Sequence, residues 1–234
     1  MYHRISNLTP KEAKSPLMRD LTVSPAHFEE QVKYLTENGF TCMLASDVDQ
    51  AVRECKPLPE RAVAITMDDG YRDNFDCAFP ILKKYNVPAT IFLVTSTVDT
   101  DGHLTWANVH EMRPHPVGYG SHTVRHLDLT SLPPDQLDYE LRESKRVLEG
   151  RLLERITAVA YPSGAYNANV TKKARDVGYL AGWKKGGGPV QPGDDPFLLP
   201  RVRVNGYATM DDFKRKVWSG VEARRERGTG KREQ

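Results

Sequence analysis

Two consecutive carboxylates, Asp68 and Asp69, follow the apolar run AVAITM and precede a glycine. Strands disfavour Asp, and like charges repel when partly buried, so some interaction must compensate for their placement. A divalent cation bound by one carboxylate would do so, and the other would lie beside the metal-bound water as a general base. An Asx turn or a helix N-cap is the alternative explanation for an isolated DDG sequence.

Two histidines, His122 and His126, lie four positions apart in the sequence SHTVRHLDL. On a helix or in a tight turn, such side chains face one direction, so both imidazoles can reach one metal ion. The pair alone is a weak signal, because in a chain with seven histidines it can equally be a chance pair on a solvated face. Its place after a glycine-containing strand favours a site shared with Asp69, with positions left open for water and substrate.

Two histidines and one carboxylate suit zinc-dependent hydrolysis, but they also suit oxygenation by non-haem iron. The ligand set alone therefore does not fix the reaction. A second Asp beside the ligand, in a chain of alternating strands and helices, favours hydrolysis. An iron oxygenase would instead require a jelly-roll pattern of strands, which this sequence lacks.

The elements that must position these residues alternate along the chain. Ser24 and Pro25, apolar residues at helical spacing and then Gly39 predict a capped helix. Further helices are expected near 105–112 and 134–149, and short apolar runs predict strands at TCML, VAITM, ATIFLV, VGYG and AVAY. Such alternation predicts a parallel sheet, open or closed into a barrel, with polar residues gathered at the carboxyl ends of the strands.

The composition is that of one globular domain of 234 residues. Its formal charge of +2 gives no reason to expect a nucleic-acid partner, and no apolar run is long enough to span a membrane. The excess charge lies in the last fourteen residues, 221–234, which have five basic and three acidic groups and no apolar periodicity. We expect a catalytic domain over residues 1–220 and a charged, disordered tail over 221–234.

Three motifs resemble those of a known family. ITMDDGYRDN, SHTVRHLDL and AYPSG, in this order and at strand ends, are similar to the first three motifs of the polysaccharide deacetylases, carbohydrate esterase family 4, also called the NodB homology domain. The resemblance covers about residues 1 to 205, and the combination of DDG with SHxxxH is specific to that family. It implies a distorted (β/α) barrel with parallel strands, in a single α/β domain.

The resemblance also implies an activity and roles for individual residues. Asp68 resembles the catalytic base, and Asp69, His122 and His126 resemble the ligands of a divalent metal, zinc or else Co²⁺, Ni²⁺ or Fe²⁺. The implied reaction is removal of acetyl groups from N-acetylglucosamine units of a polysaccharide by attack of a metal-bound water. An O-acetyl esterase acting on xylan or another glycan, and a glycan-binding barrel without turnover, are the alternatives.

Two positions depart from the common family pattern. No histidine follows His126 to supply a C-terminal general acid, whereas MYHRI resembles the opening of a circularly permuted branch that includes poly-β-1,6-N-acetylglucosamine deacetylases. His3 is therefore the candidate acid. Many members have an Arg that holds the catalytic Asp at the position of Ala160, and Arg201, in LLPRVRV, is a candidate to replace it; a surface or structural ion pair is the alternative for Arg201.

The remaining candidates would contact the substrate. The backbone N–H of Ser163, in the sequence PSG, is expected to face a developing oxyanion, although PSG is also a common turn sequence. Trp106 and Trp183 resemble aromatic residues that line the substrate groove, and a place in the core is the alternative for each. Tyr161 and Pro162 of the third motif complete the expected substrate-binding set.

The location of the protein depends on the start of the chain. The first residues, MYHRISNLTPKEAK, lack the apolar segment of a secretory signal. Because the family mostly acts in the cell envelope or outside the cell, a leader or anchor would precede this sequence if the protein is exported. If the sequence is complete, a cytoplasmic location is expected.

Overall fold

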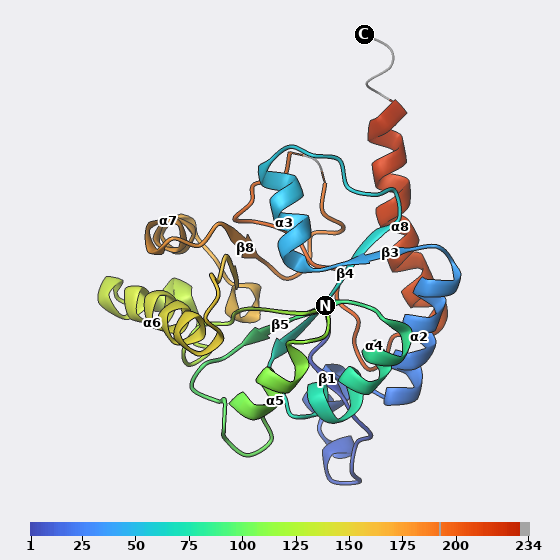
Figure 1. The fold of residues 1–234 in the computed structure, drawn as a ribbon, viewed down its shortest axis with the longest axis horizontal. Helices are drawn as coiled ribbons and strands as arrows, with labels where there is room; N and C mark the ends of the chain where they lie inside the picture. The colour runs from blue at the N-terminus through green and yellow to red at the C-terminus, as the bar shows by residue number, and fades with distance from the viewer. Residues whose placement is uncertain (192, 230–234) are drawn as a thin grey trace.

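The computed structural model describes residues 1–191 and 193–229. At its centre is a six-stranded parallel sheet in which the strands follow sequence order, β3-β4-β5-β6-β7-β8, and helices surround it (Figure 1). A second, two-stranded sheet pairs β1 with β2. The curled parallel sheet confirms the expected single α/β domain of the (β/α) barrel type.

Regular elements lie where apolar runs and helical periodicity place them. The strands are β1 (Arg4–Ile5), β2 (Thr22–Val23), β3 (Thr41–Met43), β4 (Ala62–Asp69), β5 (Ala89–Leu93), β6 (Val117–Ser121), β7 (Ala158–Ala160) and β8 (Ala181–Trp183). The helices are α1 (Pro16–Leu21), α2 (Pro25–Glu37), α3 (Ala45–Arg53), α4 (Phe79–Tyr85), α5 (Trp106–Met112), α6 (Pro134–Leu152), α7 (Ala168–Val177) and α8 (Met210–Thr229). None of the described helices has both the length and the hydrophobicity needed to cross a membrane.

Helix α2 illustrates how the sequence sets these bounds. The Ser24 hydroxyl accepts a hydrogen bond from the backbone N–H of His27, and Pro25 occupies the first turn, where no N–H is needed. At the other end, Gly39 takes the left-handed conformation with φ of 68° and turns the chain out of the helix. The predicted boundaries of this helix are therefore correct.

Two irregular segments close the barrel between β8 and β4. Residues 199–201 run beside β8, where the N–H of Lys184 donates to the backbone oxygen of Leu199. The N–H of Val204 then donates to Met1, and Tyr2 forms a parallel bridge with Met67 of β4. The two segments bring residues from both ends of the chain to the carboxyl end of β4.

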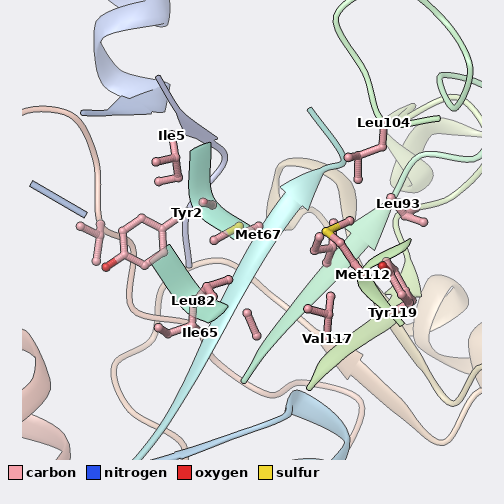
Figure 2. Packing of buried hydrophobic residues seen from close by; sticks show 14 of the residues in the cluster. Tyr2, Ile5, Ile65, Met67, Leu82, Leu93, Leu104, Met112, Val117 and Tyr119 are labelled. Atoms are coloured by element: carbon pink, nitrogen blue, oxygen red, sulfur yellow. The ribbon is translucent and has the colours of Figure 1, made fainter. Parts of the chain in front are cut away.

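The two faces of the sheet are both buried. Outward-facing residues of the strands pack against the surrounding helices, and Figure 2 shows side chains of β4, β5 and β6 in contact with Leu82 of α4 and Met112 of α5. Alternate residues on the opposite face, including Phe92, Ala160 and Trp183, form a smaller cluster inside the barrel. The two clusters hold the strands rigidly enough to fix the side chains at their ends.

The expectation of a disordered tail from residue 221 is wrong for residues 221–229, which continue helix α8. Val221 is fully buried, and the Arg224 guanidinium donates to the backbone oxygens of Glu60 and Ala62. These two anchors are isolated among charged residues, so they give no periodic signal in the sequence. The rest of the expected tail, 230–234, lies outside the described residues.

Gly182 in β8 has no room for a side chain, and this gives a prediction for its replacement. A Cβ atom at this position would lie 2.1 Å from the Tyr161 hydroxyl oxygen and 2.8 Å from the backbone oxygen of Phe197. Because backbone cannot move aside cheaply, Gly182→Ala should lower the free energy of unfolding by about 1 to 3 kcal/mol.

Gly150→Ala is the matched control, since a Cβ at this position in helix α6 would have no described atom within 4 Å apart from the adjoining backbone of its own helix. Alanine has the higher helix propensity, so this change should stabilise the protein by about 0.5 to 1 kcal/mol. Thermal and denaturant unfolding of the two variants measure both effects. Equal stability of Gly182→Ala and the wild type would contradict the described packing of β8.

Candidate active site

A cavity of about 480 Å³ opens at the carboxyl ends of the strands. Its lining includes the ends of β4 and β6, the turn after β7, helix α1, the segment after β5 and the two segments that close the barrel. Seven residues expected to carry chemistry line it: His3, Asp68, Asp69, His122, His126, Ser163 and Arg201. Parallel strands collect such residues because all their carboxyl ends lie at the same side of the sheet.

The three expected metal ligands lie around one point. One ligand atom from each of Asp69, His122 and His126 lies within 4.8 Å of the other two. The Asp69 Oδ1 atom is 3.5 Å from Nε2 of His122 and 3.6 Å from Nε2 of His126. Ligand atoms around a tetrahedral zinc ion, at bond lengths of about 2.0 to 2.2 Å, lie about 3.3 to 3.6 Å apart. The donor set and its spacing therefore fit a divalent metal.

His122 is oriented and kept neutral by its surroundings. Its Nδ1 atom lies 2.7 Å from the backbone oxygen of Ala160, so this nitrogen carries the proton and Nε2 keeps its lone pair for a metal. Burial lowers the pKa of His122, although the carboxylates of Asp68 and Asp69 act in the opposite direction. A neutral imidazole with a fixed tautomer is the form that binds metals.

The histidine pair lies in a turn and not on a helix. The turn follows β6, and its residues Thr123 and His126 have positive φ angles of 70° and 56°. The two imidazole rings meet at 72° with centroids 4.8 Å apart. The backbone of this turn therefore brings the imidazoles of His122 and His126 to the same side, as expected.

Asp69 ends β4 in a strained conformation. Its φ is 73°, which costs a residue other than glycine about 1 to 3 kcal/mol. Neither it nor Asp68 is an N-cap, because the next helical segment begins at Asn74 with Asp73 in that position. Burial raises the pKa of Asp69 to about 6, so a nearby cation would stabilise its ionised form.

Asp68 is held by Arg201 in a buried ion pair. The Nη1 and Nη2 atoms of Arg201 lie 2.5 Å and 2.8 Å from the two carboxylate oxygens, and both side chains are almost wholly buried. Burial alone would raise the pKa of Asp68, but the charge of Arg201 and its hydrogen bonds to the carboxylate hold that pKa well below its usual range. Asp68 is therefore ionised, and both of its oxygens have fixed directions.

His3 lines the same cavity from the N-terminal segment. The side-chain amide of Asn74 donates to the His3 backbone oxygen at 2.9 Å, which fixes this segment beside β4. Burial lowers the pKa of His3 to about 4, against the charge of Asp68, which favours protonation. Before substrate binds, the His3 imidazole is neutral at pH 7.

Ser163 lies in the turn after β7. Its φ is 56°, a left-handed conformation inside the short helical turn Pro162–Gly164. Ser163 and Gly164 line the cavity, and a Cβ at Gly164 would lie 2.5 Å from that of Lys185. A side chain at position 164 would collide with Lys185, which explains why glycine follows Ser163.

The two tryptophans do not line this cavity. Trp183 is 2% exposed and packs inside the barrel, so the alternative of a core residue is correct for it. Trp106 begins helix α5 and packs on the outer core, with the Arg151 guanidinium over its ring. From the sequence, an aromatic residue near a strand end can belong either to the substrate groove or to the core. Side chains alternate along β8, and Trp183 lies on the face that points into the barrel.

The other two residues of the expected substrate-binding set also lie outside the cavity lining. Tyr161 is fully buried, and its hydroxyl donates to the backbone oxygen of Phe197. Pro162 is buried beside it. Of the third motif, the structure therefore places only Ser163 and Gly164 at the cavity.

Sequence reasoning missed an aromatic pair in the cavity wall. Tyr71 and His103 both line the cavity, and their rings stack with centroids 5.2 Å apart. The position of Tyr71 directly after the DDG sequence could have indicated it. His103 gives no such signal, because only a tertiary bridge brings it to Tyr71.

Comparison with known proteins assigns the family. A model of the family described as "Polysaccharide deacetylase" matches residues 56–182, which is more than half of the chain. This match includes the acidic pair, the histidine turn and Ser163. It excludes the two segments that carry His3 and Arg201.

Individual relatives cover more of the chain. YxkH of Bacillus subtilis (strain 168), assigned by its name to the polysaccharide deacetylases, is 34% identical over 84% of this chain and 74% of its own length. The Staphylococcus aureus (strain N315) poly-beta-1,6-N-acetyl-D-glucosamine N-deacetylase is 24% identical over 94% of this chain and 81% of its length. The solved structure of Streptococcus pyogenes deacetylase PplD in complex with acetate has a TM-score of 0.86 at 28% identity and covers 93% of this chain and 96% of its own. This chain therefore belongs to the polysaccharide deacetylase family.

Proposed function

We propose that this protein is a metal-dependent hydrolase that removes acetyl groups from N-acetylglucosamine units of a polysaccharide. The observation that carries the proposal is one cavity in which Asp69, His122 and His126 surround a common point beside the ionised pair Asp68–Arg201. Membership in the polysaccharide deacetylase family supports hydrolysis of acetyl groups. The similarity to the staphylococcal poly-β-1,6-N-acetylglucosamine deacetylase supports that glycan as the substrate to test first.

Asp69, His122 and His126 would hold the metal, with zinc as the ion that best suits this donor set. A divalent ion bound there supplies a Lewis acid for the acetyl carbonyl and lowers the pKa of a water toward ~7. The side chain of His126 is 38% exposed, so the histidine turn leaves the site open to solvent and substrate on one side.

Asp68 acts as the general base. The carboxylate is ionised and its Oδ2 lies 3.9 Å from Nε2 of His122, so it is adjacent to the metal ligands without being one of them. Arg201 fixes both oxygens and keeps the carboxylate from competing for the metal. Proton removal from the attacking water by Asp68 is then an oriented step.

His3 and Ser163 complete the proposed reaction. The N–H of Ser163 donates to the developing oxyanion, and such donors contribute about 3 kcal/mol each to stabilisation of the transition state. His3 protonates the leaving amine. Because it is neutral beforehand, His3 first takes up a proton from solvent in the open cavity, which the negative charge developing on the substrate favours, and this proton then passes to the amine nitrogen.

Two alternatives keep the same cavity. An O-acetyl esterase on xylan or another glycan would use the same metal and base, but an alkoxide leaves more readily than an amide nitrogen and depends less on His3. A glycan-binding barrel without turnover would have no use for Asp68 held ionised beside a metal site. Acetate release from β-1,6- and β-1,4-linked N-acetylglucosamine oligomers and acetylxylan, with chelator or with added zinc or cobalt, separates the three.

The adjacent carboxylates should respond differently to isosteric replacement. Asp68→Asn should abolish turnover while zinc content stays near one per chain, because Asp68 lies beside the metal ligands. Asp69→Asn should lose turnover and most of the zinc, because a neutral amide is a poor zinc ligand. Metal analysis and acetate release on both variants test this, and equal zinc loss in the two would reverse the assigned roles.

Replacing His3 should discriminate between leaving groups. His3→Ala should reduce deacetylation of an N-acetylglucosamine oligomer by roughly 10² to 10⁴, the range for losing a positioned acid. Hydrolysis of an activated aryl acetate should suffer much less, since its phenolate leaves without a proton. His110→Ala, an exposed histidine of α5, is the control and should leave both rates unchanged. Equal losses on both substrates would show that His3 shapes the site instead of donating a proton.

A further inference from the structure

Helix α6 buries a carboxylate beneath the histidine turn. Glu140 is fully buried and does not line the active-site cavity. An ionised carboxylate is costly to bury unless donors surround it. Three do so here: the backbone N–H groups of Val124 and Arg125 donate to Oε2, both at 2.9 Å, and Nε of Arg125 donates to Oε1 at 2.6 Å.

Every backbone N–H from His122 to His126 has an acceptor, and the Oε2 atom of Glu140 accepts two of these hydrogen bonds. The N–H of His122 donates to the backbone oxygen of Leu93, and the N–H of Thr123 donates to the Ser121 hydroxyl. The N–H of His126 donates to the Thr123 hydroxyl at 3.1 Å. The middle of the turn therefore depends on a side chain from another element, since Val124 and Arg125 donate to Glu140 and not to a carbonyl of the turn.

The turn would not hold this shape from local preference alone. Thr123 is β-branched and has a φ of 70°, and His126 also has a positive φ. Such conformations cost about 1 to 3 kcal/mol each and persist only where the surroundings enforce them. On the carbonyl side, the N–H groups of Thr95 and Ser96 donate to the oxygens of Thr123 and Val124, which ties the turn to the end of β5.

We propose that Glu140 is a positioning residue for the metal site, which rests on the proposed metal-dependent function. Its carboxylate fixes the backbone between His122 and His126 and so sets the distance of the two imidazoles from Asp69. Glu140 lies outside the lining of the cavity, so its effect passes through the amides of Val124 and Arg125. Loss of these two hydrogen bonds frees the turn, and the ligand atoms then spend less time at the spacing that a metal requires.

Glu140→Gln tests this with almost no change in volume. A glutamine places an NH₂ group either against the two backbone N–H groups or against Nε of Arg125, so a donor faces a donor in both orientations. Glu143→Gln is the matched control, because Glu143 lies one turn away on α6 and pairs with Arg146 at the surface. Two measurements are needed: hydrogen exchange of the amides at 123–126 in metal-free protein, and zinc affinity by competition with a chromogenic chelator.

We expect faster exchange at these amides in Glu140→Gln and a zinc affinity lower by about 10- to 100-fold, the usual loss when an outer partner of a metal site is removed. Glu143→Gln should match the wild type in both. Unchanged exchange and affinity in Glu140→Gln, or equal changes in the control, would overturn the proposal. A general loss of packing would instead accelerate exchange throughout α6 and β6.

A second variant covers the case in which Glu140→Gln does not fold. Glu140→Asp keeps the charge but withdraws the carboxylate by one methylene, so the same local exchange and the same direction of zinc loss are expected. Wild-type exchange and affinity in folded Glu140→Asp would also overturn the proposal. If the wild-type protein binds no zinc, the metal-dependent function fails separately, while exchange in metal-free protein still decides whether Glu140 holds the turn.

Discussion

The site depends on a buried ion pair that joins distant parts of the chain. Asp68 lies one residue before the end of strand β4, and Arg201, 133 positions later, lies on the segment that closes the barrel beside β8. Removing one partner of such a pair leaves an uncompensated buried charge, at a cost of about 3 to 5 kcal/mol. Closure of the barrel and ionisation of Asp68 are therefore linked, because the segment that completes the fold also carries the cation that pairs with the proposed base.

The three proposed metal ligands are placed in a different way, by two strand ends and one irregular turn. Asp69 and His122 lie at or next to the ends of β4 and β6, which pair with β5 between them, so their separation is set by sheet geometry. His126 comes from the turn, whose strain is balanced by hydrogen bonds to Glu140 and to residues after β5. The proposed catalytic groups thus combine precise placement with one side open to substrate.

Much of this arrangement could be predicted from the sequence, because its signals are local. Apolar runs fixed the strands, and polar residues after them predicted which side of the sheet carries the site. The core position of Trp183 could not be predicted, because it depends on which face of β8 points into the barrel. The continuation of α8 past Val221 could not be predicted either, because it depends on two isolated contacts, those of Val221 and Arg224. The pairing of Arg201 with Asp68 was only a candidate, since nothing local in LLPRVRV indicates its partner.

In the proposed function, two imidazoles and one carboxylate of this chain form a single metal centre. Zinc K-edge X-ray absorption on protein loaded with one equivalent of zinc measures that coordination shell directly. We expect nitrogen and oxygen ligands at about 2.0 to 2.2 Å with the outer scattering of two imidazoles, and loss of one imidazole in His126→Ala. A shell without imidazole scattering, or one unchanged by that replacement, would contradict the proposed metal centre.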